Sequence, residues 1–148
     1  MQKVILLLIA LSGLAACEKQ DQIARSVDDY KAEAAADVAL YDVRDAKKLV
    51  GDDSVVFVDV REDDEIALHG KIEGAVHVPR GVLEFYVDPK SAHHMDIFSS
   101  GKQVIFYCES GGRSLLAAKR AMDMGVSDAA SLEGGFEAWV EAGGATSP

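Results

Sequence analysis

Short, strongly apolar runs alternate with mixed apolar and polar segments along most of the chain. Residues 54–59 and 103–107 are apolar at nearly every position, which is typical of strands buried on both faces of a parallel sheet. Residues 75–78, which end at Pro79, and residues 127–132 predict two further short strands. Helices are expected between and after these strands, at residues 43–50, 61–68, 115–122 and in a short final segment with Phe136 and Trp139. The alternation predicts an α/β fold with a central, mostly parallel sheet and helices on both faces.

The first 38 residues have a different pattern. Residues 4–10 form an apolar run too short to span a membrane, and the segment ends in Leu14-Ala15-Ala16-Cys17. This ending resembles the lipobox of bacterial lipoprotein precursors, in which the cysteine is lipidated. Residues 1–16 are therefore expected to be a lipoprotein signal peptide, residues 17–38 a polar tether and residues 39–145 the folded domain. A plain secretory signal with an incidental cysteine is the alternative interpretation.

The resemblance to lipoprotein precursors implies a place in the bacterial cell envelope, facing the periplasm and held by lipid. Glu18, rather than aspartate, follows Cys17, which favours the outer membrane over the inner one. The formal net charge of −10 argues against nucleic acid as a partner and against electrostatic binding to anionic lipid. The membrane is therefore expected to be reached through the lipid alone.

The two cysteines have different expected roles. If Cys17 carries lipid, Cys108 is the one free thiol in the chain and cannot close an intramolecular disulfide. No group of cysteine, histidine or carboxylate residues has the spacing of a zinc or calcium site, so neither a metal nor another cofactor is expected.

Cys108 opens the segment Cys108-Glu109-Ser110-Gly111-Gly112-Arg113-Ser114, which follows an expected strand and leads into an expected helix. The first N–H groups of a helix have no partner within it, and small residues let the preceding backbone curl into a nest of N–H groups. Such a nest favours the thiolate form of a cysteine, the form that acts as a nucleophile. Arg113 adds a planar cation suited to an oxyanion. A buried structural cysteine is the alternative, which the flanking Gly-Gly-Arg disfavours.

Four residues separate Cys108 from Arg113, which resembles the active-site loop of the rhodaneses, sulfurtransferases that carry sulfur as a cysteine persulfide. Three further segments are similar to rhodanese motifs: Asp59-Val60-Arg61, residues 72–79, and residues 132–139 followed by Gly143. The resemblance covers about residues 40–144. It implies a single rhodanese-like domain that moves sulfur from thiosulfate or a persulfide donor to a thiol or cyanide-type acceptor.

Roles for individual residues follow from this resemblance. Cys108 is the expected nucleophile, and the N–H groups of Glu109, Ser110, Gly111, Gly112, Arg113 and Ser114 are the expected substrate-binding groups, with Arg113 on the anionic part of the donor. Ser114 could instead cap the helix. Asp59 and Arg61 are expected to support the loop, and an ion pair that only holds their turn is the preferred interpretation. Gly134 and Gly135 are expected to let the backbone pass close to the loop.

Glu109 places a negative charge next to Cys108 in an already acidic chain. Repulsion predicts slow use of the thiosulfate dianion and a lower KM for thiosulfate in Glu109→Lys.

Two other functional classes remain open for a chain with this loop. A phosphatase or arsenate reductase normally has five residues between cysteine and arginine, so the spacing here argues against it. A lipid-anchored module that senses sulfur or oxidants through Cys108 would use the same loop.

Overall fold

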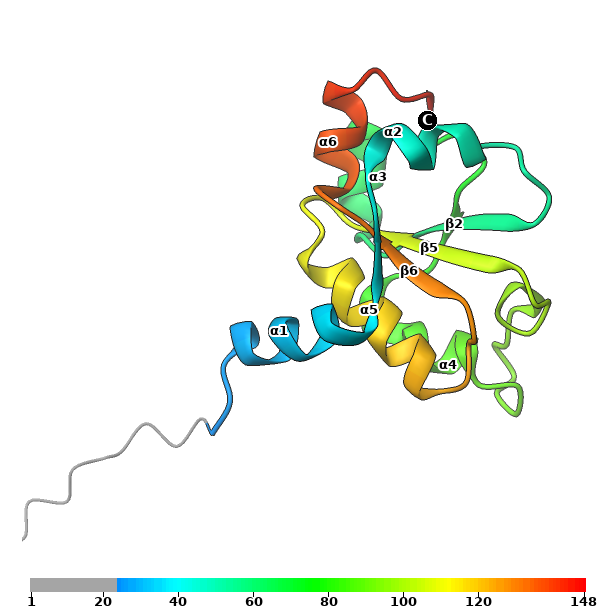
Figure 1. The fold of residues 1–148 in the computed structure, drawn as a ribbon. Helices are drawn as coiled ribbons and strands as arrows, with labels where there is room; N and C mark the ends of the chain where they lie inside the picture. The colour runs from blue at the N-terminus through cyan, green and yellow to red at the C-terminus, as the bar shows by residue number, and fades with distance from the viewer. Residues whose placement is uncertain (1–23) are drawn as a thin grey trace, which may run out of the picture.

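A computed structural model describes residues 24–148, and its core is a five-stranded sheet (Figure 1). The strand order is β1-β6-β5-β2-β4, and every pair of neighbouring strands is parallel. The strands are β1 (Ala39–Tyr41), β2 (Val55–Asp59), β4 (Val76–His77), β5 (Gln103–Tyr107) and β6 (Ala129–Leu132). The expected signal peptide and Cys17 lie outside the described residues.

The central strands are buried because both of their faces are covered. Val104 and Phe106 of β5 point to one face and Ile105 and Tyr107 to the other, and all four are buried. A strand between two helical layers has no solvent face, which explains why its sequence shows an uninterrupted apolar run instead of an alternation.

Helices cover both faces of the sheet, as the sequence predicts (Figure 1). One layer contains α1, α4 and α5, and the other contains α2, α3 and α6. Their bounds are α1 (Val27–Asp37), α2 (Val43–Ala46), α3 (Asp63–His69), α4 (Leu83–Val87), α5 (Gly112–Asp123) and α6 (Gly135–Glu141). The predicted fold class, a mostly parallel α/β sheet with helices on both faces, is confirmed.

Smaller elements complete the domain. Asp42 caps α2, as the sequence predicts, and accepts a hydrogen bond from the backbone N–H of Arg44 at 2.8 Å. Trp139 of α6 is fully buried in the second layer, and its ring N–H donates to the carbonyl of Ala145. Two strands outside the main sheet pair antiparallel, β3 (Lys71–Ile72) and β7 (Thr146–Ser147), and short 3-10 helices lie at Lys47–Leu49, Arg80–Val82 and Asp96–Phe98.

The helix α1 lies within the segment that the sequence predicts to be a tether. Ser26 and Asp29 form a reciprocal capping box at its start, and α1 packs against α5 with Ala34 fully buried. Residues 27–38 are therefore part of the folded unit and not a tether. The helix has only a weak signal in the sequence, because a small alanine face packs on α5 without the usual stripe of large apolar residues.

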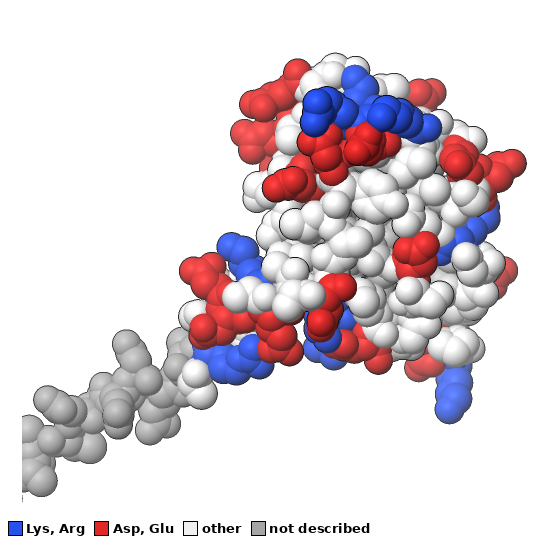
Figure 2. Space-filling view, in the orientation of Figure 1, with Lys and Arg blue, Asp and Glu red and all other residues white. Residues whose placement is uncertain are grey.

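Charged side chains are mixed over the surface. On the face shown in Figure 2, some basic side chains gather near the top, directly beside acidic ones, and the others are scattered among acidic side chains. Among residues 24–148, no helix combines the length and hydrophobicity that crossing a bilayer requires. The same residues contain no group of three or more His, Cys, Asp or Glu side chains placed to hold a metal ion.

Candidate active site

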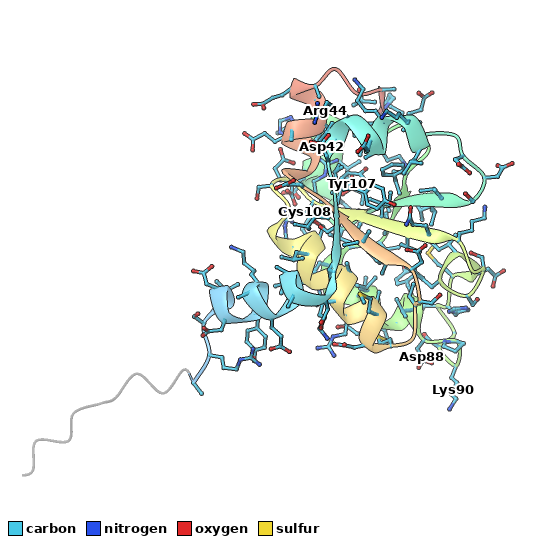
Figure 3. The ribbon with its side chains drawn as sticks, in the orientation of Figure 1. Asp42, Arg44, Asp88, Lys90, Tyr107 and Cys108 are labelled. Carbon is cyan, nitrogen blue, oxygen red and sulfur yellow. The ribbon has the colours of Figure 1, made fainter. Side chains whose placement is uncertain are left out.

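Cys108 lies directly after β5, at the carboxyl edge of the sheet, where the chain turns into α5 (Figure 3). Gly111 is the residue before α5 and has a φ of +95°, a left-handed conformation that glycine adopts without strain. We call residues 108–113 the Cys108 loop. Ligands of parallel α/β sheets bind at this edge, so the placement makes the loop the candidate site.

Backbone hydrogen bonds from α6 orient the start of the Cys108 loop. The carbonyl of Cys108 accepts from the N–H of Phe136 at 2.7 Å, and the carbonyl of Glu109 accepts from the N–H of Glu137 at 3.1 Å. All peptide bonds of the described chain are trans, so each carbonyl and the N–H that follows it point in opposite directions. The N–H groups of Glu109 and Ser110 therefore face away from α6.

The other end of the loop is fixed by α5. The carbonyl of Gly111 accepts from the N–H of Leu115 at 3.1 Å and from the hydroxyl of Ser114 at 3.0 Å. The N–H of Gly111 donates to the sulfur of Cys108 at 3.2 Å. The N–H groups of Gly112, Arg113 and Ser114 form the first turn of α5, where a helix supplies no acceptor. The sulfur therefore accepts one backbone donor and lies beside the free N–H groups of this first turn, while Cys108 also packs at the margin of the core formed by β5 and α5.

Gly135 allows the close approach of α6 to the loop. A Cβ at Gly135 would lie 2.4 Å from the carbonyl oxygen of Cys108 and 2.5 Å from that of Glu109, and φ at this residue is +61°. Only glycine fits both the conformation and the space. The prediction that this glycine lets the backbone pass close to the loop is confirmed.

Cys108 is only 1% exposed. Burial by itself would also fit a structural cysteine, the alternative that the sequence disfavours. The surroundings separate the two cases, because the sulfur accepts a backbone N–H and Arg113 lies beside it. A structural cysteine packed as a small hydrophobe needs neither.

Arg113 is held by a carboxylate that the sequence analysis did not identify. Its two terminal nitrogens donate to the two carboxylate oxygens of Glu65 in α3, at 2.7 and 2.6 Å. These hydrogen bonds lower the pKa of Glu65 to about 2, although partial burial opposes the shift. They also raise the pKa of Arg113 against the effect of its own burial, and the neighbouring Cys108 adds to the rise. The cation of the loop is therefore already neutralised within the protein.

Asp59 and Arg61 form a fully buried ion pair, with Arg61 Nη2 2.7 Å from Asp59 Oδ2. Arg61 also donates to the carbonyl of Gly70 at 2.6 Å, and its guanidinium carbon lies 4.0 Å from the ring centre of Phe136. These contacts fit the preferred interpretation, in which the pair holds the turn after β2. Arg61 additionally donates to the carboxylate of Glu109 at 3.1 Å, which ties this turn to the Cys108 loop.

Glu109 shares its cation with Asp59. The carboxylate of Glu109 lies 3.1 Å from Arg61, which already pairs with Asp59, so these three groups keep one net negative charge beside Cys108. The repulsion expected from Glu109 stays a prediction, and the carboxylate that offsets the cation of the loop is Glu65. The sequence places four acidic residues at positions 62–65, and nothing in their order shows which of them reaches Arg113.

The two serines of the segment have different surroundings. Ser110 is exposed, whereas Ser114 is buried and its hydroxyl is committed to the carbonyl of Gly111. Ser131 of β6 donates to the hydroxyl of Ser114 at 2.9 Å. These two hydroxyl groups hold the carbonyl of Gly111 in place. The N-cap of α5 is Gly111 and no side chain caps the helix, so the capping role expected as an alternative for Ser114 is wrong.

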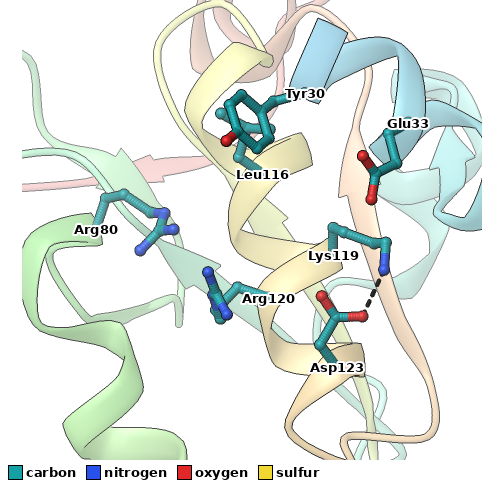
Figure 4. A pocket seen from close by; sticks show the side chains of 7 residues that line it. All are labelled: Tyr30, Glu33, Arg80, Leu116, Lys119, Arg120 and Asp123. Atoms are coloured by element: carbon teal, nitrogen blue, oxygen red, sulfur yellow. Dashed lines mark hydrogen bonds and ion pairs between the residues drawn. The ribbon is translucent and has the colours of Figure 1, made fainter. Parts of the chain in front are cut away.

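A hollow of about 260 Å³ lies away from Cys108, between α1, α5 and the segment around Arg80 (Figure 4). Its cations are already paired. Lys119 bonds to Asp123, and Glu84 lies 3.4 Å from Arg80 and 3.2 Å from Arg120. Each cation of the hollow therefore has a carboxylate partner, with Glu84 shared by Arg80 and Arg120, and we assign the hollow no role.

Comparison with known proteins places the fold and this loop in a family. A model described as the rhodanese-like domain matches residues 42–142. The thiosulfate:glutathione sulfurtransferase of Saccharomyces cerevisiae is 32% identical over 122 residues, which cover 74% of this chain and 83% of that protein. Its human counterpart by name is 30% identical over 89 residues, covering 56% and 76%.

Solved structures agree on the fold. A Rhodopseudomonas palustris protein of unknown function, described as a possible tyrosine phosphatase, superposes with a TM-score of 0.83 at 42% identity and covers 86% of this chain and 98% of its own. A human single-domain sulfurtransferase gives a TM-score of 0.59 at 25% identity, with 70% and 96% covered.

The chain therefore belongs to the rhodanese-like domain family. Within that family it is a rhodanese-type sulfurtransferase.

Proposed function

We propose that the protein transfers sulfane sulfur through a persulfide on Cys108. In the first half-reaction the thiolate attacks the outer sulfur of thiosulfate, the new S–S bond forms, and the S–S bond of the donor breaks to release sulfite. An organic persulfide donor would react in the same way and leave as its thiolate. The outer sulfur of the enzyme persulfide then carries the negative charge.

In the second half-reaction an acceptor thiolate attacks the outer sulfur of the persulfide. The acceptor leaves as a persulfide, and Cys108 returns to the thiolate, so no external electrons are needed. Cyanide would accept the same sulfur as thiocyanate, and sulfite would accept it as thiosulfate. The names of the yeast and human relatives, thiosulfate:glutathione sulfurtransferases, support a low-molecular-weight thiol as acceptor.

One observation carries the proposal: the N–H of Gly111 donates to the sulfur of Cys108 at 3.2 Å, at the start of α5, whose first N–H groups have no acceptor within the helix. Donors fixed in place stabilise a charge that moves from the inner to the outer sulfur, and they need no reorganisation to do so. Ser110 is exposed, so we expect its hydroxyl to be free to donate to the leaving group or the acceptor. The partner molecules are therefore small, sulfur-containing anions and thiols.

Slow use of thiosulfate remains part of the proposal. Glu65 neutralises Arg113, and Asp59 and Glu109 share Arg61, so these five groups carry one net negative charge. No surplus positive charge remains among these groups to attract a dianion, so we infer that a persulfide is the preferred donor.

Mass spectrometry of the purified domain tests the function. Incubation with thiosulfate should add one sulfur atom to Cys108, and cyanide should remove it with formation of thiocyanate. Cys108→Ser is the control and should show neither change. A domain that gains no sulfur from thiosulfate or from a persulfide would contradict the proposal.

Two alternative functions, a phosphatase and a sensor, have readouts of their own. The description of the Rhodopseudomonas protein raises phosphatase activity, which release of phosphate from an aryl phosphate would reveal. The four-residue spacing and the occupied Arg113 do not favour it. A sensor would instead accumulate stable oxidised or mixed-disulfide forms of Cys108 without turnover.

We further propose that Cys17 carries lipid and holds the domain at the periplasmic side of a bacterial membrane, with the outer membrane favoured. The sequence Leu14-Ala15-Ala16-Cys17 after a short apolar run supports this proposal. Metabolic labelling with a fatty-acid analogue tests it, because Cys17→Ser should abolish both the label and the membrane association. Label that persists in Cys17→Ser would refute the assignment.

A further inference from the structure

The ion pair between Glu65 and Arg113 is more rigid than a typical surface pair. Glu65 is the third residue of α3, and its Oε2 atom also accepts the backbone N–H of Glu62 at 3.0 Å. With the two bonds from Arg113, the carboxylate therefore accepts three hydrogen bonds. A bidentate pair of this kind fixes the plane of the guanidinium as well as its position.

This pair lies where the anionic end of a donor must be placed. Arg113 is the last residue of the Cys108 loop and lies beside the sulfur. The side chain of Arg113 is 38% exposed, whereas Cys108 is 1% exposed. A donor whose outer sulfur reaches Cys108 therefore brings its remaining atoms close to both Arg113 and Glu65. The guanidinium attracts that end of the donor, and the carboxylate repels it.

We propose that Glu65 is a specificity-determining residue, which selects sulfur donors of low negative charge by neutralising Arg113. The inference rests on the proposed function, since it concerns which donor charges Cys108. A persulfide with a single negative charge on its outer sulfur loses little from the presence of Glu65. Thiosulfate carries two negative charges and loses more.

Two donors that differ in charge but not in the reacting group separate this effect from general damage. Methanethiosulfonate carries a methyl group in place of one oxygen of thiosulfate and has one negative charge fewer. Each donor gives the same persulfide on Cys108, with sulfite leaving in one case and methanesulfinate in the other. The ratio of the two kcat/KM values therefore measures the response of the site to one unit of charge.

The decisive variant is Glu65→Gln, measured at low ionic strength with cyanide as acceptor. Glutamine keeps the shape of the side chain and an acceptor for the N–H of Glu62, so the start of α3 is retained. We expect the ratio of kcat/KM for thiosulfate to that for methanethiosulfonate to rise by about tenfold, and added salt to reduce the rise. A variant that is merely damaged would lose activity with both donors and keep the ratio.

Asp63→Asn is the matched control, because it removes one negative charge from the same turn of α3. The side chain of Asp63 is 93% exposed and faces His77 rather than Arg113. We expect the ratio to stay within about twofold of the wild-type value. An unchanged ratio in Glu65→Gln, or an equal rise in Asp63→Asn, would overturn the inference. The proposed function fails separately, if the wild-type protein takes sulfur from neither donor.

Discussion

Replacing Gly135 by alanine should disable the Cys108 loop without touching the cysteine. The added Cβ would lie 2.4 Å from the carbonyl oxygen of Cys108 and 2.5 Å from that of Glu109. Neither oxygen can rotate away without breaking its hydrogen bond, to the N–H of Phe136 or to that of Glu137. The loop and the start of α6 must therefore separate.

The cost can be worked out from these contacts. A non-glycine residue at a φ of +61° costs about 1 kcal/mol, and each of the two lost hydrogen bonds costs about 1 kcal/mol more. Together these terms predict a loss of about 3 kcal/mol in the free energy of unfolding, or about 10 °C in Tm for a domain of this size. Because the carbonyls also orient the N–H groups around the sulfur, thiocyanate formation should fall by more than about tenfold at a temperature where the variant is folded.

Gly143→Ala provides the matched control. Gly143 has a φ of +65°, close to that of Gly135, but a Cβ there would meet nothing within 4 Å. The Gly143→Ala variant therefore isolates the cost of the backbone conformation, about 1 kcal/mol in the free energy of unfolding, and should leave sulfur transfer unchanged. The reasoning would be refuted if Gly135→Ala melted no lower than Gly143→Ala, or if it formed thiocyanate at the wild-type rate.

Three further predictions follow from the ion pairs around the loop. Arg61→Met leaves the carboxylate of Asp59 buried without its cation, and urea denaturation should show a loss of about 4 kcal/mol; a loss below about 1 kcal/mol would contradict the burial of the pair. Glu109→Gln should lower the KM for thiosulfate less than Glu65→Gln does, because the carboxylate of Glu109 is directed to Arg61; steady-state kinetics with an equal or larger effect would count against this assignment. The pKa of Glu65 is lowered from 4.5 to about 2, so its stabilising contribution is complete above pH 4.5 and is lost as the pH falls toward 2. The difference in Tm between the wild type and Glu65→Gln should shrink over that pH range, and a constant difference would show that Arg113 does not act on the charged carboxylate.

The tertiary structure corrected the sequence analysis mainly where a partner came from a distant segment. Glu65 and Arg113 are 48 positions apart, and the acidic run at residues 62–65 gives no indication of which side chain faces the loop. The helix α1 lies where the sequence predicts a tether, because its packing face is made of alanine, which carries no strong periodic signal. In both cases the deciding information is the position of a neighbouring element.

The sequence alone determined the fold class and the position of the candidate nucleophile. Apolar runs such as residues 103–107 specify strands buried on both faces, and a cysteine followed by small residues and a helix fixes where the loop lies, because these signals are local in the chain. Only the tertiary structure decided which charges meet at the loop. Glu65 approaches Arg113, Arg61 approaches Glu109, and α6 orients the carbonyl of Cys108, since each contact depends on how separate elements pack across the edge of the sheet.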